Sequence, residues 1–275
     1  MYQTYAPAPE LSPYIECYWR WQSGDENPQT EFIVPDAAPE LIVHLGKPPS
    51  ARSGSGTWQR QPSEFLYCAA EHCLELRFDQ PMDVFGVRFR PWGLSLFSQQ
   101  PMSAMLDRAV SPTEALDGLA QPLVNAVRNA GADERQLEKL NRLLSQLPPT
   151  RKDRAAEIAM LIDSLDAGEK PVQLLAEGLA KSSRTVRRVW RQLVGISPRA
   201  YQKLMRVHRA LAQIEDGQPM AAVAADCGFA DQAHMARQIK EISGLTPSRL
   251  KTWLGQETYR DLYASRRKAP WIERS

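Results

Sequence analysis

Arginine is the residue type in this chain whose spacing best suits chemistry, and the arginines gather in the second half of the sequence. Residues 181–209 hold nine basic side chains and no acidic one. A solvated helix face is the simplest explanation of a basic run. The lack of any acid over this length favours contact with the phosphates of a nucleic acid instead.

The charge of the whole chain is divided in the same way. The net charge is +2, yet the part up to Thr150 carries 12 basic and 18 acidic residues, and the part after it carries 22 and 14. This asymmetry indicates a basic domain that binds a polyanion, joined to an acidic domain with another task. A length of 275 residues suits two domains that each bury a core.

The basic stretch contains a pattern typical of two helices joined by a tight connection. Residues 171–195 read PVQLLAEGLAKSSRTVRRVWRQLVG, and Ser182 is the expected N-cap of the second helix. In that helix the apolar residues form one stripe, which consists of Val186, Val189, Trp190 and Leu193. The arginines face elsewhere. Because arginine pairs bidentately with guanine or phosphate, such a face suits a helix in the DNA major groove.

A second helix-turn-helix pattern follows at residues 219–244, where Asp231 is the expected N-cap and Gly228 allows the tight bend. Met235, Ile239 and Ile242 are expected to point inward. Residues 198–216 between the two patterns predict a helix of about 18 residues, about 27 Å long. A helix of that size can hold two recognition helices near one turn of DNA apart, about 34 Å.

These residues together resemble one family closely. The resemblance rests on Ser182, Arg184, Val186, Arg188, Trp190, Gly195, Ser197, Pro198, Tyr201, Arg206, Ala210, Gly228, Phe229, Asp231, Gln232, Arg237, Gly244, Thr246 and Pro247. The region 151–254 is similar to the DNA-binding domain of the AraC/XylS family of bacterial transcription regulators. More weakly, PDAAPELIVHL (35–45) and VFGVRFRPWG (84–93) resemble the small β-rich sensor domain of one branch of that family.

The resemblance implies that double-stranded DNA is the partner. Base or phosphate contacts are expected from Ser183, Arg184, Arg187, Arg188 and Arg191 in the first unit, and from Gln232, Ala233 and Arg237 in the second. Phosphate contacts are expected from Lys181, Arg199 and Lys203, and from the tail residues Arg266, Arg267 and Lys268. Trp190, Met235 and Ile239 stand where the family commonly has phenylalanine, which should repack the core without changing the chemistry.

The first half of the sequence predicts short strands at 14–21, 31–34, 40–45, 64–68, 73–78 and 84–89, followed by helices after Pro91. We therefore expect an α+β two-domain chain. Its N-terminal domain, residues 1–148, is a mainly antiparallel partial cupin-like barrel with flanking helices. Its C-terminal domain, residues 151–254, is all helical with two helix-turn-helix units joined by a long helix, and a basic tail occupies 255–275.

A leucine stripe marks the last helix of the first domain, at Leu137, Leu140, Leu144 and Leu147. It either packs on its own domain or forms a homodimer. Aromatic residues of the same domain fill its core or line a cavity for a small effector. The candidate ligand residues are Trp19, Trp21, Glu40, Arg88 and Trp92.

The sequence gives little support to catalysis. His44 and His72 are too few for a metal site, no cofactor is expected, and no nucleophile triad or nucleotide-binding loop occurs. Cys68 and Cys73 are interpreted as buried structural thiols rather than a redox pair. No apolar run reaches the roughly 18 residues that a membrane span requires. The cysteine usage fits a cytoplasmic protein.

The sequence thus predicts a DNA-binding transcription regulator, an activator that contacts RNA polymerase or a repressor, modulated at its N-terminal domain by a ligand or partner. Two alternatives remain open. The first is an enzyme tethered to DNA by the helical domain, and the second is a dimerisation domain that binds no ligand.

Overall fold

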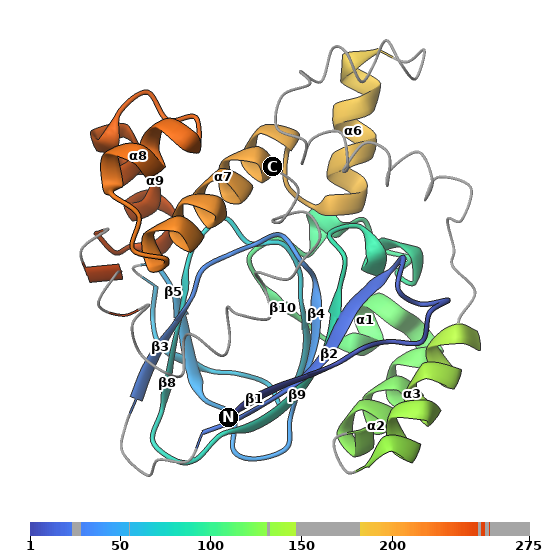
Figure 1. Ribbon diagram of the computed structural model, residues 1–275. Coiled ribbons are helices and arrows are strands. Elements are labelled where there is room, and N and C mark those ends of the chain that lie inside the picture. Colours follow the sequence, from blue (N-terminus) through green and yellow to red (C-terminus); the bar gives the residue numbers. More distant parts are fainter. Residues whose placement is uncertain are drawn as a thin grey trace.

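The computed structural model describes residues 1–23, 29–54, 56–130, 133–146, 182–246, 249–250 and 253. It has an N-terminal antiparallel β domain with flanking helices and a helical C-terminal domain, as the sequence predicts (Figure 1). The predicted boundary at 148–151 and the basic tail at 255–275 lie outside the described residues. Among the described residues, none of the helices combines the length and apolar character that crossing a bilayer requires.

Two antiparallel sheets form the β domain. The larger has the strand order β1 (Tyr2–Tyr5), β2 (Ile15–Gln22), β9 (Asp83–Phe89), β4 (Glu40–His44), β7 (Glu64–Tyr67) and β10 (Ala109–Val110). The smaller has the order β3 (Gln29–Ile33), β8 (Leu74–Phe78), β5 (Ser50–Ser53) and β6 (Gln59–Arg60). The six predicted strands are confirmed. The prediction missed β1, β5, β6 and β10.

The larger sheet buries both of its faces, as its central strand β9 shows. Phe85, Val87 and Phe89 point to one face and join a core shared with the helices. Val84 points to the other face and joins a smaller core between the two sheets, with Trp19, Trp21, Leu76, Phe78 and Met82. Gly86 also belongs to that second face. The position requires a glycine because the Trp19 ring occupies the space that a side chain would need. A Cβ atom there would lie 2.3 Å from the ring.

A buried ionic cluster ties the loop before β4 to the larger sheet. The Arg88 guanidinium, 3% exposed, donates from Nε to Glu16, from Nη1 to Glu40 and from Nη2 to Asp36, at 2.8, 2.8 and 2.6 Å. A buried charge is tolerated only when it is paired, so removing this arginine would leave three carboxylates without their cation.

Short helices cover the outer face of the larger sheet: η1 (Gly93–Leu96), η2 (Met102–Ala104), α1 (Pro112–Leu116), η3 (Asp117–Leu119), α2 (Ala120–Ala130) and α3 (Glu134–Gln146). Asn141 on α3 accepts hydrogen bonds from the Tyr18 hydroxyl and the Ala8 amide, at 2.7 and 3.0 Å. These bonds hold α3 against the β domain.

The leucine stripe on α3 packs within its own domain. Leu140 and Leu144 are fully buried in the main core, and Leu137 is partly buried against it. Leu147 lies outside the described residues. Packing accounts for the two central leucines, because a side chain buried in its own chain is not available to a second copy. The homodimer stays a prediction.

The C-terminal domain consists of α6 (Ser183–Val194), α7 (Pro198–Glu215), α8 (Met220–Asp226) and α9 (Gln232–Ser243). The predicted connecting helix is confirmed as α7, which is 18 residues long. Ser197 caps it by accepting from the Ala200 amide, and Pro198 fits its first turn because that position needs no amide donor.

Both ends of the helical domain contact the β domain. At one end Gly195, which follows α6 with φ of 94°, lies against the Met102 carbonyl, so that a Cβ atom would be 3.3 Å from its oxygen. At the other end the Cys73 amide donates to the Ile242 carbonyl at 3.0 Å. The rings of Phe32 and Trp253 also meet edge to face, 5.4 Å apart.

The middle of α7 is attached as well. The Nε2 atom of His208 lies 2.7 Å from the Pro35 carbonyl oxygen, and the residue is only 6% exposed. The His208 ring is thus a buried side chain with its hydrogen-bond partner within the chain. Its partner lies in the β domain, which sequence spacing does not indicate.

Glu31, on β3 beside Trp253, should make stability depend on pH. Burial raises the pKa of Glu31 from 4.5 to about 7, and a hydrogen bond with Trp253 opposes part of that rise. The pKa of Glu31 is higher in the folded state than in the unfolded state. The protonated carboxyl therefore stabilises the fold fully below the unfolded pKa of 4.5, and this stabilisation is lost as pH rises through 7. Between about pH 5 and 8, Glu31 should lower the free energy of unfolding by up to about 3 kcal/mol.

Denaturant unfolding of the wild type and of Glu31→Gln at several pH values measures this effect. We expect the variant to lack this part of the pH slope, whereas Glu71→Gln, at an exposed carboxyl, should keep it. Equal slopes for wild type and Glu31→Gln would contradict the assignment.

Candidate nucleic-acid interface

The helix predicted to be the first recognition helix is α6, and its amphipathic pattern sets its orientation. Ser182 caps it by accepting from the Thr185 amide at 3.2 Å, as predicted. Val186, Trp190 and Leu193 are buried. The Trp190 ring packs edge to face on Tyr201 of α7, with 5.3 Å between ring centres. This packing fixes which side of α6 stays in solvent.

The solvent side of α6 carries four arginines: Arg184, Arg187, Arg188 and Arg191. All four are exposed, and none has an acidic partner among the described residues. Ser183 at the start of the helix is partly exposed. The side chains that the sequence selects for DNA contact therefore share one accessible helix. The helix predicted before α6 and the predicted contact residue Lys181 lie outside the described residues.

The helix predicted to be the second recognition helix, α9, also has a side-chain N-cap and a buried apolar side, but it exposes fewer charged residues than α6. Asp231 caps it by accepting from the His234 amide at 2.6 Å, which confirms the predicted cap. Gln232, Ala233 and Arg237 are exposed. The inward residues Met235, Ile239 and Ile242 are buried, also as predicted.

Arg206 of α7 makes contacts within the second helix-turn-helix unit. Its guanidinium donates to the Gly228 carbonyl at 3.4 Å and to Gln238 at 3.3 Å, and it lies over the Phe229 ring, 5.1 Å from the centre. Burial is the largest cause that lowers the pKa of Arg206, and Arg209 and Arg199 add to it. This arginine fixes the turn between α8 and α9 to the connecting helix.

Lys203 is also engaged within the domain, in an ion pair with Glu241 at 2.7 Å. A phosphate would have to compete with that carboxylate for Lys203. Arg199 is exposed at the start of α7 and is paired with no carboxylate among the described residues. His234 lies between the Ala230 amide, which donates to its Nδ1 atom, and the Gln238 side chain. Arg266, Arg267 and Lys268 fall outside the described residues.

The two recognition helices lie at opposite ends of α7 (Figure 1). A helix of 18 residues is about 27 Å long, which is somewhat less than the roughly 34 Å of one DNA turn.

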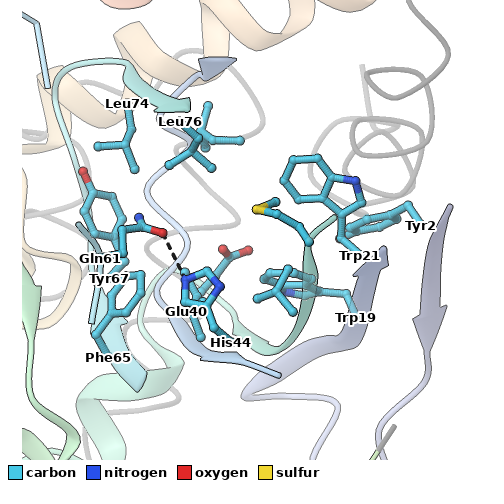
Figure 2. Close-up of a pocket in the computed structure, with 14 residues that line it drawn as sticks. Tyr2, Trp19, Trp21, Glu40, His44, Gln61, Phe65, Tyr67, Leu74 and Leu76 are labelled. Atoms are coloured by element: carbon cyan, nitrogen blue, oxygen red, sulfur yellow. Dashed lines mark hydrogen bonds between the residues drawn. The ribbon is translucent and has the colours of Figure 1, made fainter. Parts of the chain in front are cut away.

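A cavity of about 60 Å³ lies between the two sheets (Figure 2). Three of the predicted ligand residues, Trp19, Trp21 and Glu40, line it. Arg88 does not line it but bonds to Glu40 behind the wall, and Trp92 packs on Tyr14 in the main core. Sequence reasoning missed further wall residues, which are Tyr2, Ile33, Ile42, His44, Gln61, Phe65, Tyr67, Leu74, Leu76, Met82 and Val84.

The polar groups of the cavity are uncharged or acidic. The Nε2 atom of His44 lies 3.1 Å from Gln61 Oε1 (Figure 2). Burial lowers the pKa of His44 to about 4, so its ring is neutral at neutral pH. Burial also raises the pKa of the Tyr67 hydroxyl above its ordinary value. The Nε1–H groups of Trp19 and Trp21 are buried without a hydrogen-bond partner among the described residues.

The burial of Cys68 and Cys73 fits the structural role expected of them. Cys68 and Cys73 are free and buried, and burial raises the pKa of each thiol to about 12. Since the thiolate is the reactive form, these side chains are poor nucleophiles and poor metal ligands. Among the described residues no group of three or more His, Cys, Asp and Glu side chains is arranged to hold a metal ion.

Comparison with known families decides what the helical region is. Residues 175–252 match the model of a helix-turn-helix domain family, which spans both recognition helices. The C-terminal region of this chain is an AraC-type helix-turn-helix domain. Residues 3–111 match a domain of unknown function, DUF6597. No curated protein sequence matches the chain significantly.

Solved structures that are similar to this chain include ToxT from Vibrio cholerae, at 12% identity over 93% of this chain and 99% of that one, with a TM-score of 0.49. A ToxT structure with bound unsaturated fatty acid has 11% identity, covers 86% of this chain and 96% of that one, and has a TM-score of 0.46. An AraC-type regulator from Chromobacterium violaceum has 19% identity over 38% of this chain and 96% of that one, with a TM-score of 0.33.

An AraC-type domain is a DNA-binding module of bacterial transcription regulators. The helix-turn-helix domain therefore supports a DNA-binding transcription regulator. The sequence-based prediction of the family is confirmed.

Removing the Asp231 cap should loosen the second AraC-type unit. Asp231→Ala should lower the free energy of unfolding by about 1 kcal/mol, because the amide at the start of α9 loses its acceptor. Denaturant unfolding measures this loss. Asp226→Ala removes the same charge from an exposed position that caps nothing, and it should change stability little. Similar losses in the two variants would show that charge rather than capping is responsible.

Proposed function

We propose that this regulator reads two successive major-groove segments of one DNA duplex, and that a small ligand in the β domain modulates the reading. The observation that carries the first part is the exposed face of α6, with four arginines that have no carboxylate partner among the described residues. Guanidinium groups free of internal ion pairs are available to guanine edges and phosphates.

The first unit supplies most of the base discrimination. On α9 only Gln232 and Arg237 offer polar groups beside the Ala233 methyl, whereas α6 presents four guanidinium groups. A methyl group can contact thymine but reads no donor or acceptor. Ser183, Arg199 and Lys203 position the domain on the sugar–phosphate backbone of the DNA. Lys203 does so after it leaves its ion pair with Glu241 and binds a phosphate.

Ligand modulation has a physical route in the β domain. Ile33 and Leu74 line the cavity and pair with each other across β3 and β8. Their chain neighbours Phe32 and Cys73 contact the second unit, through Trp253 and Ile242. A ligand that displaces the cavity wall therefore acts one residue away from the contact that places α9.

Selection of bound DNA from a random pool, with the full chain, tests the reading mode. We expect two conserved blocks whose centres lie about 10 base pairs apart, because consecutive major grooves repeat at that spacing. A single conserved block, or no enrichment, would refute the two-groove proposal.

Arg188→Ala should weaken binding to the selected DNA by about 1 to 3 kcal/mol and relax preference in one block. The reason is loss of a guanidinium that reads a base or holds a phosphate. Fluorescence anisotropy titration measures the change. Arg60→Ala, which removes an exposed arginine of the β domain, is the matched control and should bind as the wild type does. Unchanged affinity in Arg188→Ala would exclude this residue from the interface.

Binding should also weaken steeply with salt. Each phosphate contact releases condensed counterions, so several contacts from Arg, Lys and helix N-termini predict a loss of orders of magnitude between about 50 and 200 mM salt. The same titration at several salt concentrations gives the slope. A nearly flat slope would contradict the phosphate contacts.

A further inference from the structure

The cavity between the two sheets has a wall that is apolar apart from a few groups. Besides Glu40, His44 and Gln61, the side chains that line it are aromatic, aliphatic or methionine, and they come from strands of both sheets (Figure 2). A pocket of this kind holds a largely apolar ligand and orients it through a small number of polar atoms.

The charges around the cavity favour an uncharged ligand. In the described part of the chain no lysine or arginine lines it, and burial lowers the pKa of His44 to about 4, so this ring is neutral at neutral pH. Glu40 lines the cavity, but its carboxylate is already paired with the Arg88 guanidinium at 2.8 Å. An anion would therefore find no cation on the wall, and a cation would have to compete with Arg88 for Glu40. Either ion would lose its hydration on entry, which is costly without a partner of opposite charge.

His44 presents one hydrogen-bonding atom to this space. The residue is 8% exposed, and its Nε2 atom lies 3.1 Å from Gln61 Oε1. Because an amide oxygen only accepts, Nε2 carries the proton of the neutral ring and Nδ1 is an acceptor. Nδ1 makes no hydrogen bond with any residue that the structure describes. In Figure 2 it lies on the side of the ring that faces Trp19. A buried acceptor in this position calls for a donor.

We infer that the cavity binds a small uncharged alcohol, whose hydroxyl donates to Nδ1 of His44 and whose apolar part lies among the aromatic and aliphatic side chains. A volume of about 60 Å³ suits about five non-hydrogen atoms, since one water-sized group needs about 10 to 15 Å³. A four-carbon alcohol has this size. The inference rests on the proposed ligand modulation, since it names the ligand class of that same cavity.

Four probes of similar size separate the effect of charge from that of hydrogen bonding. Isobutanol donates and accepts, butanone only accepts, isobutylammonium is a cation and isobutyrate is an anion. Each is titrated into the full chain without DNA, with carbon-13 label in the isoleucine methyl groups. NMR spectra then follow Ile33 and Ile42, which line the cavity. Ile214, which is buried on α7, is the internal control and should shift little.

Isobutanol should bind most tightly of the four. We expect butanone to bind about fivefold more weakly, because a ketone offers Nδ1 no donor. Both ions should bind about tenfold more weakly than isobutanol, because they lose their hydration without gaining a free partner of opposite charge. Equal or tighter binding of butanone or of either ion would overturn the inference. So would a lack of isobutanol binding, or shifts at Ile214 as large as those at Ile33 and Ile42.

Two variants locate the hydroxyl. His44→Phe replaces the acceptor with an apolar ring and should remove most of the preference for isobutanol over butanone. His72→Phe makes the same exchange at an exposed histidine outside the cavity wall, and it should keep that preference. If His44→Phe does not fold, the order of the probes on the wild type still decides. An unchanged preference in a folded His44→Phe would overturn the assignment of His44.

DNA affinity is then measured with and without isobutanol, and His44→Phe shows any effect that the alcohol has as a solvent. Isobutanol binding with no effect on DNA would refute the modulation but leave the ligand class standing. Failure of isobutanol to bind, beside intact DNA recognition, would refute the ligand class alone.

Discussion

The need to bury both faces of one sheet organises this molecule. Strands β2, β9, β4 and β7 carry apolar side chains on both sides, so each side must be covered. The helices after Pro91 cover one side, and the second sheet covers the other. The large rings of Trp19 and Trp21 lie between the two sheets. The side chains there do not fill the space between the sheets completely. The cavity is the result, together with its acidic edge at Glu40.

The same covering surfaces carry the DNA-binding domain. The short helix η2 supports the end of α6, and the β3–β8 edge supports α9 and Trp253. The main core runs without a break from the sheet into the helices of the AraC-type domain. Since each recognition helix has its own contact with the β domain, a change at one contact need not disturb the other. Under the proposed ligand modulation, a ligand near β3 and β8 would act on α9, the helix that exposes fewer polar groups.

Much of the interface could be predicted from the sequence, because local rules determine it. The caps Ser182 and Asp231, the buried stripe of α6 and the length of α7 follow from hydrogen bonding and periodicity within each helix. Strands with clear alternation were equally predictable. The strands β1, β5, β6 and β10 were missed because YQTY, SARS, QR and AV lack an apolar pattern of their own and pair at sheet edges or in short ladders.

The cavity was only partly predictable because its wall is made by pairing distant strands. The sequence selected Trp19 and Trp21 as candidate ligand residues, but nothing local places His44 and Gln61 on the same cavity wall. Arg88 was selected as a polar pocket residue, whereas three carboxylates surround it behind the wall. Likewise, Lys203 is basic and lies in the right stretch, and only the packing of α7 on α9 reveals that Glu241 is its partner.

The attachment of α7 at its middle has a consequence for the DNA itself. His208 lies 2.7 Å from the Pro35 carbonyl oxygen, so the connecting helix is attached to the β domain at its middle as well as near its ends. Straight B-form DNA repeats its grooves at about 34 Å, somewhat more than the rod of about 27 Å provides. If α6 and α9 enter successive grooves as proposed, the double helix would have to curve toward the protein. Flexible pyrimidine–purine steps between the two blocks would then be favoured although no side chain touches them.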